Sequence, residues 1–468
     1  MKTTGRILFF IVLLSALTSK LFAQKVNSLY FLERTAMHTR MNPAMAPKNS
    51  CFGLGLGNIA LNIQSDLALS DVLIPGQNGS LISFMHPDAD KALFLSGLGD
   101  VSNFSGNFNM ELINLGLRMK QAYISFHSGI YMDMGLGMPK DFFSLFMLGM
   151  DATQPSTQFD LSVLNFETNL YNKTGVGLSL GLGEIFSLGV NVDYLIGLGH
   201  MKLGFDELSI NASDQSWEVV SKGYIRYAGP KQLMLTYSDE NYLNGITTDF
   251  SSLTGPEASY GELLSTGKGF SVDLGFTARP LPFLSLSASV TDLGFINWNN
   301  DYVQQAVSNE TYRFDGMDLA FGESSEDEEE GNAIGDQLQE LMRLSKDVSS
   351  EAFVSKLTSK LNIGAEAGVL NNRISFGLLS QTAFADNALL YQDFMLSANF
   401  KPGSLLQAAL TYSLLHGKMS SFGAAINLKL LLVNFFLAAD YIPLFYNPQM
   451  IPLNNSHFNL QTGFNLMF

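Results

Sequence analysis

Apolar residues alternate with polar residues or glycine along much of this chain, and the clearest example is its last segment, residues 456–468. The apolar side chains of that segment share one parity: Phe458, Leu460, Phe464, Leu466 and Phe468. Successive side chains of a β-strand point to opposite faces, so this period of two predicts a strand with one apolar and one polar face. A chain built mainly from such segments is constrained to an antiparallel sheet with two unlike faces.

The same period recurs from residue 50 to the C-terminus. Apolar residues hold the even positions from 164 to 182, and 160–183 is predicted to be one long strand, followed after a turn at 184–185 by a second over 186–198. In the first strand the apolar parity switches, which predicts a β-bulge near Asn58. Helices are predicted only inside connections: short ones at 67–75 and 141–150, and an amphipathic helix-like stretch at 333–344.

The first residues have the pattern of a secretory signal peptide. Lys2 and Arg6 precede an apolar run over 7–17, and the small residue Ala23 supplies a cleavage site, so residues 1–23 are predicted to be removed. The run is shorter than the roughly 20 residues of a transmembrane helix. No cysteine follows the apolar core, so cleavage of the lipoprotein type is not expected.

The charge and the cysteine count exclude several classes of function. The chain has 27 basic and 43 acidic residues and a formal net charge of −16, and losing the signal peptide removes only basic residues. Such an excess of acidic residues argues against nucleic acid as a partner. Cys51 is the only cysteine, so neither an intramolecular disulfide nor a thiolate metal cluster is expected. We predict no cofactor and no metal site.

An exported chain with a positive mean hydropathy (+0.14) and no apolar helical span after residue 23 is typical of an outer-membrane β-barrel. The connections between predicted strands alternate between tight and long, as in such barrels. The predicted tight turns lie at 120–121, 184–185, 279–282, 370–373, 401–404 and 430–432. The sequence therefore predicts an all-β, transmembrane antiparallel barrel of about 14 strands, or 16 if a hairpin predicted at 217–237 joins the wall.

The predicted organisation has three parts. Residues 1–23 are the signal peptide, residues 24–49 are an N-terminal plug or hatch, and residues 50–468 are the barrel. Long extracellular loops are expected, and the acidic connection at 297–359 is the longest of them. Both termini are expected on the periplasmic side of a bacterial outer membrane, with the last strand pairing with the first.

Three motifs carry a family resemblance: Asn42-Pro43-Ala44, SLGVNVDYLIGLG at 187–199 and DLGFINW at 292–298. In this order they resemble a Bacteroidota family of outer-membrane barrels of unknown function, which is itself similar to FadL-like and PorV-like barrels. The FadL-like resemblance implies a fourteen-strand barrel, plugged by an N-terminal hatch, that passes hydrophobic molecules. The PorV-like resemblance implies a role in protein secretion and surface attachment.

The barrel interpretation places a set of polar residues on inward faces, as candidate lumen-lining residues: Tyr123, His127, Asp133, Glu167, Asn191, Asp193, Asp273 and Glu366. They could line a polar channel or orient a ligand, or they could only hydrogen-bond one another in a filled lumen. The candidate plug residues Asn42, Pro43 and Ala44 have two interpretations as well. They form either an element that moves for substrate passage or a turn that anchors the N-terminus.

Two further features have functional alternatives. The acidic run at 323–330 suits Ca²⁺ by its oxygen ligands, but it lacks the spacing of an EF-hand loop and is also typical of a solvated acidic loop. Trp298, Tyr194 and Tyr441 lie near strand ends, where aromatic residues commonly anchor a barrel at the membrane interface.

The sequence favours a barrel that binds or passes a hydrophobic small molecule by plug displacement or lateral release, without chemistry. No nucleophile, metal or phosphate-binding motif is present, so we predict that the protein is not an enzyme. The alternative is a barrel that does not transport and instead scaffolds the secretion or surface attachment of proteins. The expected partners are outer-membrane lipid and either a hydrophobic small molecule or a secreted or surface protein.

Overall fold

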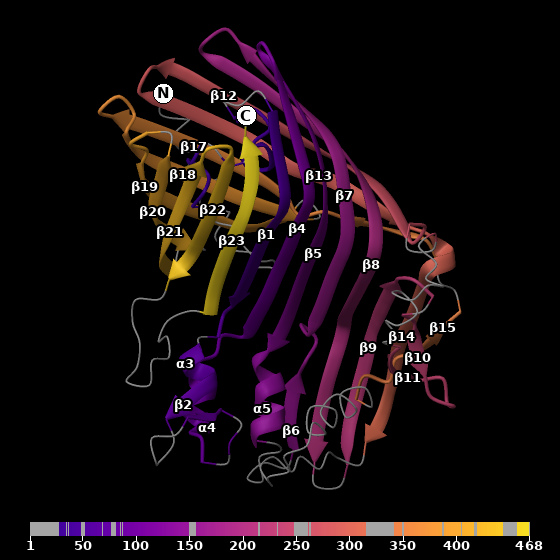
Figure 1. Cartoon of the computed structure of the whole chain (residues 1–468). Coiled ribbons are helices and arrows are strands. Elements are labelled where there is room, and N and C mark those ends of the chain that lie inside the picture. The colour runs from indigo at the N-terminus through magenta and orange to yellow at the C-terminus, as the bar shows by residue number, and fades with distance from the viewer. Residues whose placement is uncertain are drawn as a thin grey trace, which may run out of the picture.

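The computed structural model describes residues 28–33, 35, 37–47, 52–67, 69–75, 81–84, 86, 88–148, 156–213, 216–231, 233–247, 261, 264–314, 341–348, 351–385, 388–403, 405–415, 419–442 and 456–467. Fourteen antiparallel strands of this part close into a barrel (Figure 1). In wall order they are β1 (Phe52–Ser65), β4 (Val101–Met119), β5 (Ala122–Pro139), β7 (Asn165–Leu182), β8 (Phe186–Ser213), β12 (Gly267–Leu281), β13 (Leu284–Trp298), β17 (Ser359–Val369), β18 (Ile374–Ala385), β19 (Ala388–Phe400), β20 (Leu406–Leu415), β21 (Met419–Leu430), β22 (Val433–Ile442) and β23 (Ser456–Met467).

The first and last strands close the barrel. β1 pairs with β23 from Gly53↔Met467 to Ser65↔Ser456, and its other edge pairs with β4. The register between β1 and β23 shifts between Leu56 and Ile59, where Gly57 has a φ of 64°, so the predicted bulge near Asn58 is confirmed. The predicted fourteen-strand count is confirmed as well.

The two faces of the wall differ as the alternation predicts. Outward rows are apolar and exposed, as Leu410 is at 68%, whereas inward rows hold buried polar residues such as Asn434 and Gln461. An apolar outer face and fully paired strands are what a bilayer requires of a spanning sheet. Among the described residues, no helix is long and apolar enough to cross a membrane.

The two ends of the barrel are unlike. Short turns join β4 to β5, β7 to β8, β12 to β13, β17 to β18, β19 to β20 and β21 to β22 at the end we call the turn end, drawn at the top of Figure 1. The opposite end, the loop end, carries folded connections: α3 (Leu69–Val72), β2 (Leu73–Pro75), β3 (Leu81–Ser83), α4 (Lys91–Gly97), α5 (Lys140–Leu148) and β6 (Ser156–Asp160). Helices α3 and α5 fall inside the two connections where the sequence predicted short helices, and most of the stretch at 333–344 lies outside the described residues.

The wall extends beyond the barrel at the loop end because β8 is 28 residues long. Its first half pairs with β12, and its second half pairs with β6 and β9 (Trp217–Ala228). The extension continues from β9 to β14 (Val303–Phe314) and β15 (Ser345–Asp347), and β16 (Phe353–Lys356) pairs with the end of β13. An apolar cluster that includes Leu145, Phe159 and Ile210 packs α5 against this extension.

Two predicted connections differ from the structure. The hairpin at 217–237 is wrong, because β9 pairs with β8 and β14 while β10 (Leu235–Tyr237) pairs only with β11 (Leu243–Ile246). These strands extend the sheet outside the barrel instead of raising the strand count to 16. The connection at 382–391 should be long if tight and long connections alternate, and this expectation is also wrong, since β18 and β19 stay paired to Ala385↔Ala388.

We expect Leu410→Arg to lower the free energy of unfolding in a lipid bilayer by about 2–4 kcal/mol, because Leu410 faces outward in the middle of β20. Leu430→Arg is the matched control, since Leu430 is equally exposed (65%) but ends β21 at a turn, where the cost is about 0–1 kcal/mol. Denaturant titration of both variants in vesicles measures the difference. Equal costs at the two positions would contradict a bilayer-spanning wall.

Candidate functional site

The described residues between 28 and 47, which we call the N-terminal segment, lie inside the barrel. Near its start, the Ser28 hydroxyl hydrogen-bonds Asp440 of β22 and Thr411 of β20. Arg118 of β4 donates to the Pro47 carbonyl near its end. Between these points the segment contains one helical turn, α2 (His38–Met41). Because its contacts reach strands far apart around the wall, the segment crosses the lumen.

Apolar side chains hold the first part of this segment against one half of the wall. Leu29, Leu32 and Met37 pack with small inward residues of β20 to β22 and with Phe436. Within the segment, His38 Nε2 lies 2.9 Å from the Leu29 carbonyl oxygen. Burial lowers the pKa of His38 to about 4, so the ring is neutral at neutral pH and donates its proton to that carbonyl.

The candidate plug residues Asn42, Pro43 and Ala44 sit in a notch made by two inward glycines. A Cβ on Gly189 would overlap the backbone of Pro43 and Ala44, and a Cβ on Gly275 would lie 2.7 Å from Ala44 N. Asn42 donates to the Ala288 carbonyl at 3.2 Å, and its Oδ1 accepts from Ala44 N at 2.9 Å. The backbone therefore approaches β8 and β12 more closely than any other residue type at these two positions would allow.

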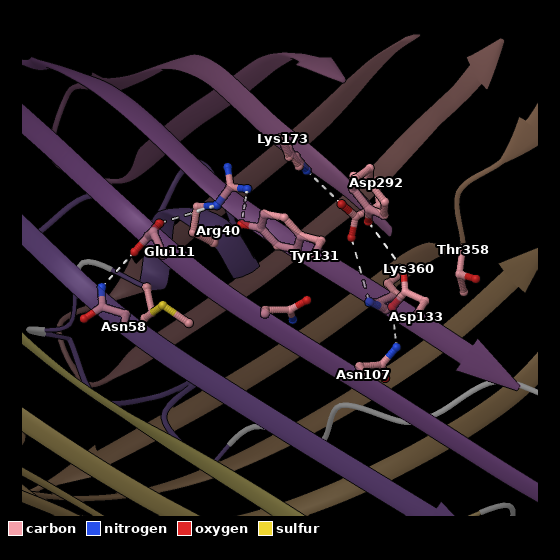
Figure 2. Close-up of a pocket in the computed structure, with 13 residues that line it drawn as sticks. Arg40, Asn58, Asn107, Glu111, Tyr131, Asp133, Lys173, Asp292, Thr358 and Lys360 are labelled. Carbon is pink, nitrogen blue, oxygen red and sulfur yellow. Dashed lines mark hydrogen bonds and ion pairs between the residues drawn. The ribbon is translucent and has the colours of Figure 1, made fainter. Parts of the chain in front are cut away.

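Arg40 carries the charge of α2 into a buried group of carboxylates. Its guanidinium donates to Tyr131 Oη at 2.9 Å and lies 3.9 Å from Glu111 (Figure 2). It also hydrogen-bonds His127 and lies 3.9 Å from Asp193. Burial opposes the charge, but these neighbours outweigh it and raise the pKa of Arg40, so the side chain stays protonated.

Lys173 is the second buried cation, and it comes from the wall. Its Nζ lies 2.7 Å from Asp292, 2.9 Å from Asp193 and 3.5 Å from Asp273. Asp292 has a φ of 61° and stands at a register irregularity of β13, where its backbone N donates to Asp273 Oδ1 at 2.7 Å. A backbone position that disfavours most L-residues is thus held by the charge pairing around it.

Four of the eight predicted lumen residues come together around these cations. His127 lies 2.6 Å from Asp193, and Asn191 donates to Asp273 at 3.0 Å. The sequence prediction did not include Arg40, Lys173, Glu111 and Asp292. Glu111 and Asp292 are inward carboxylates that lie next to register irregularities of their strands. Lys173 could have been identified from the sequence, because it is a lysine on the inward parity of a predicted strand.

The other four predicted residues are dispersed. Tyr123 is buried, with the Arg118 guanidinium 5.5 Å from its ring. Asp133 accepts from Asn107, Glu167 pairs with Lys202 at 3.0 Å on the extension side, and Glu366 pairs with Lys401 at 2.5 Å near the turns. They do not form one site.

Two cavities flank the N-terminal segment. The turn-side cavity, about 300 Å³, lies between Tyr30, Phe31 and Met45 of the segment and the turns at 120–121 and 183–185. The loop-side cavity, about 70 Å³, is bordered by Met37 and Arg40 of the segment and reaches Lys360 at the start of β17 (Figure 2). The segment therefore separates the lumen into two compartments.

An apolar cluster around Trp298 adjoins the loop-side cavity, and Tyr131 and Tyr171 belong to both. Trp298 is fully buried (0% exposed), donates from Nε1 to Ser355 Oγ at 2.8 Å and stacks with Phe353. The prediction that Trp298 anchors the barrel at the lipid interface is therefore wrong. Tyr194 does lie exposed on an outward row, whereas the side chain of Tyr441 and the acidic run at 323–330 lie outside the described residues.

Comparison with known proteins gives the family. The family of unknown function DUF5723 matches residues 43–440. The chain belongs to DUF5723. A search of curated proteins finds no match for this DUF5723 chain.

Solved structures resemble this DUF5723 chain at low identity. The Pseudomonas putida toluene transporter TodX is 8% identical over 96% of each chain, with a TM-score of 0.37. The monoaromatic hydrocarbon channel CymD is 9% identical over 93% of this chain and 94% of its own, with a TM-score of 0.40. A Pseudomonas aeruginosa FadL homologue is 10% identical over 91% of each chain, with a TM-score of 0.35.

We expect Arg40→Met to destabilise the docked N-terminal segment by about 3–5 kcal/mol, because it leaves Asp193 and Glu111 without their shared cation in a buried site. Hydrogen exchange of residues 37–47 measures the loss. Arg279→Met is the control: its partner Glu33 is 3.8 Å away and both side chains are more than a third exposed, so a loss below about 1 kcal/mol is expected. Equal protection in both variants would refute the role given to Arg40.

Proposed function

We propose that this chain is an outer-membrane barrel whose N-terminal segment closes the lumen and moves aside to let a small molecule bind or pass, without chemistry. The observation that carries the proposal is how the segment is held. Among the described residues, the backbone–backbone hydrogen bonds of the N-terminal segment, such as that from Asn42 N to the His38 carbonyl, run within the segment. Its ties to the wall are made through side chains, so it can leave without breaking any strand ladder.

The two cavities support the same proposal. Each borders the segment, and they share no lining residue. A movement of the segment around α2 would join them, because Arg40 borders one cavity and His38 the other. In the proposed orientation in the membrane, the turn end faces the periplasm and the extension faces the cell exterior. Barrels of this class have short turns on the periplasmic side and long connections on the outside.

The nature of the cargo is a separate question. The turn-side cavity has apolar side chains on the segment, Tyr30, Phe31 and Met45, and these support the prediction of a hydrophobic cargo. The loop-side cavity is lined almost entirely by polar side chains, which do not. Hydrophobic cargo and lateral release therefore remain predictions.

One observation favours the alternative, a scaffold for secreted or surface proteins. The second half of β8, with β9 and β14, forms a packed sheet outside the barrel that the closure of the wall does not need. A protein that co-purifies in stoichiometric amount with the full chain, and is lost when this extension is removed, would favour scaffolding over passage.

We expect Gly275→Val to raise ion conductance several-fold in planar bilayers. Valine suits the strand but its side chain needs the space that Asn42 and Ala44 occupy, so the N-terminal segment is displaced and the wall is kept. Gly199→Val in β8 is the matched control, because a Cβ there meets no atom within 4 Å. The gating role of the segment would be refuted if the Gly275→Val barrel folds and has wild-type conductance, and deletion of residues 28–47 also leaves the conductance unchanged.

A further inference from the structure

A row of polar side chains crosses half of the wall in register. Asp440, Asn459, Asn62, Asn107, Asp133, Asn169 and His200 are successive partners on β22, β23, β1, β4, β5, β7 and β8. Each points into the lumen, and most are buried there. We call this row the polar belt. It begins at the carboxylate that binds Ser28 and ends at the ring that packs on Trp298.

Hydrogen bonds connect members of the polar belt. Asn459 donates to Asp440 at 3.0 Å, and Asn62 donates to Asn107 Oδ1 at 3.4 Å. Asn107 in turn donates to Asp133, and His200 Nδ1 lies 2.8 Å from Asn169 Oδ1. Since amides are both donors and acceptors, the belt offers a hydrogen-bonding surface that a solute with hydroxyl or amide groups can match.

The loop-side cavity opens onto the polar belt at Asn107 and Asp133. Of the 13 residues that line it, all but Met37 have a polar side chain. The ionisable ones balance, with three cations and three carboxylates: Arg40, Lys173, Lys360, Glu111, Asp133 and Asp292. Asp193 and Asp273 lie behind this lining, 2.9 and 3.5 Å from Lys173 Nζ, so carboxylates outnumber cations around the cavity and disfavour an anion. A cation would lie against the three basic side chains of the lining.

One buried donor on this cavity lacks a hydrogen-bond acceptor among the described residues. Arg40 Nε is buried, and its nearest carboxylate oxygen, on Glu111, is 3.9 Å away, beyond hydrogen-bonding distance. A polar solute in the loop-side cavity could accept from it, whereas a hydrophobic one would leave this donor unsatisfied.

We infer that the loop-side cavity, which has the belt residues Asn107 and Asp133 on its lining, is a binding site for a small, uncharged, polyhydroxylated solute. The inference rests on the proposed function, because it names the class of molecule that the gated lumen takes. Neutrality follows because basic side chains line the cavity and a surplus of carboxylates surrounds it. Polyhydroxylation follows from the amide and hydroxyl groups of the lining.

Equilibrium dialysis of the full chain in detergent micelles tests the inference with three four-carbon probes. We expect saturable binding of erythritol and weaker or no binding of its carboxylate analogue threonate and of butanol. Asn107→Leu is expected to weaken erythritol binding by about tenfold, the cost of one lost hydrogen-bonding partner. Asn109→Leu, on the same cavity, is the second variant if Asn107→Leu does not fold. Asn309→Leu, exposed on β14, is the control and should bind as wild type.

The outcomes separate the inference from the proposed function. Butanol or threonate binding as tightly as erythritol, or erythritol binding unchanged in the folded cavity variants, overturns the inference and leaves gating untouched. Erythritol binding that is lost in the cavity variants supports it. Such binding in a protein whose conductance no segment variant alters would keep the site but refute passage.

Discussion

The rest of this structure depends on the closure of its sheet. A backbone amide or carbonyl facing lipid costs several kcal/mol if it lacks a partner, so a spanning sheet cannot keep a free edge. The pairing of β1 with β23 removes both edges at once. Closure also has a consequence for the inner face. Because side chains alternate along each strand, an apolar outer face implies a polar inner face, and closure encloses these polar side chains in a lumen with little access to water.

The N-terminal segment provides partners for these enclosed polar side chains. It supplies Arg40 to carboxylates of β4 and β8, and its Ser28 hydroxyl to Asp440 on the far wall. Lys173 completes the balance from the wall itself. Removing Arg40 would leave the buried Glu111 without its cation, which costs far more than an exposed ion pair is worth. Close approach at Gly189 and Gly275 then fixes where the segment lies.

Much of the wall could be predicted from parity alone, including fourteen strands, the bulge near Asn58 and the inward faces of His127 and Asp193. The failures arise where parity changes without a local signal. Val290 faces outward, so simple alternation puts Trp298 outward as well. The irregularity at Asp292 shifts the row, Phe295 becomes the outward residue, and Trp298 turns into the lumen. The sequence also does not predict which strands pair outside the barrel. No local signal around β9 indicates that it pairs with β8 and β14.

The notch formed by Gly189 and Gly275 also bears on how the molecule assembles. The segment in it precedes β1, and β1 is one of the two strands that close the wall. After closure, the segment could reach the notch only through an end of the barrel, because each of the fourteen wall strands is then paired on both edges. The direct order is for the segment to settle on β8 and β12 while β1 and β23 are still apart. The barrel would then assemble around its N-terminal segment, and this segment would act as the template that sets the curvature of the wall.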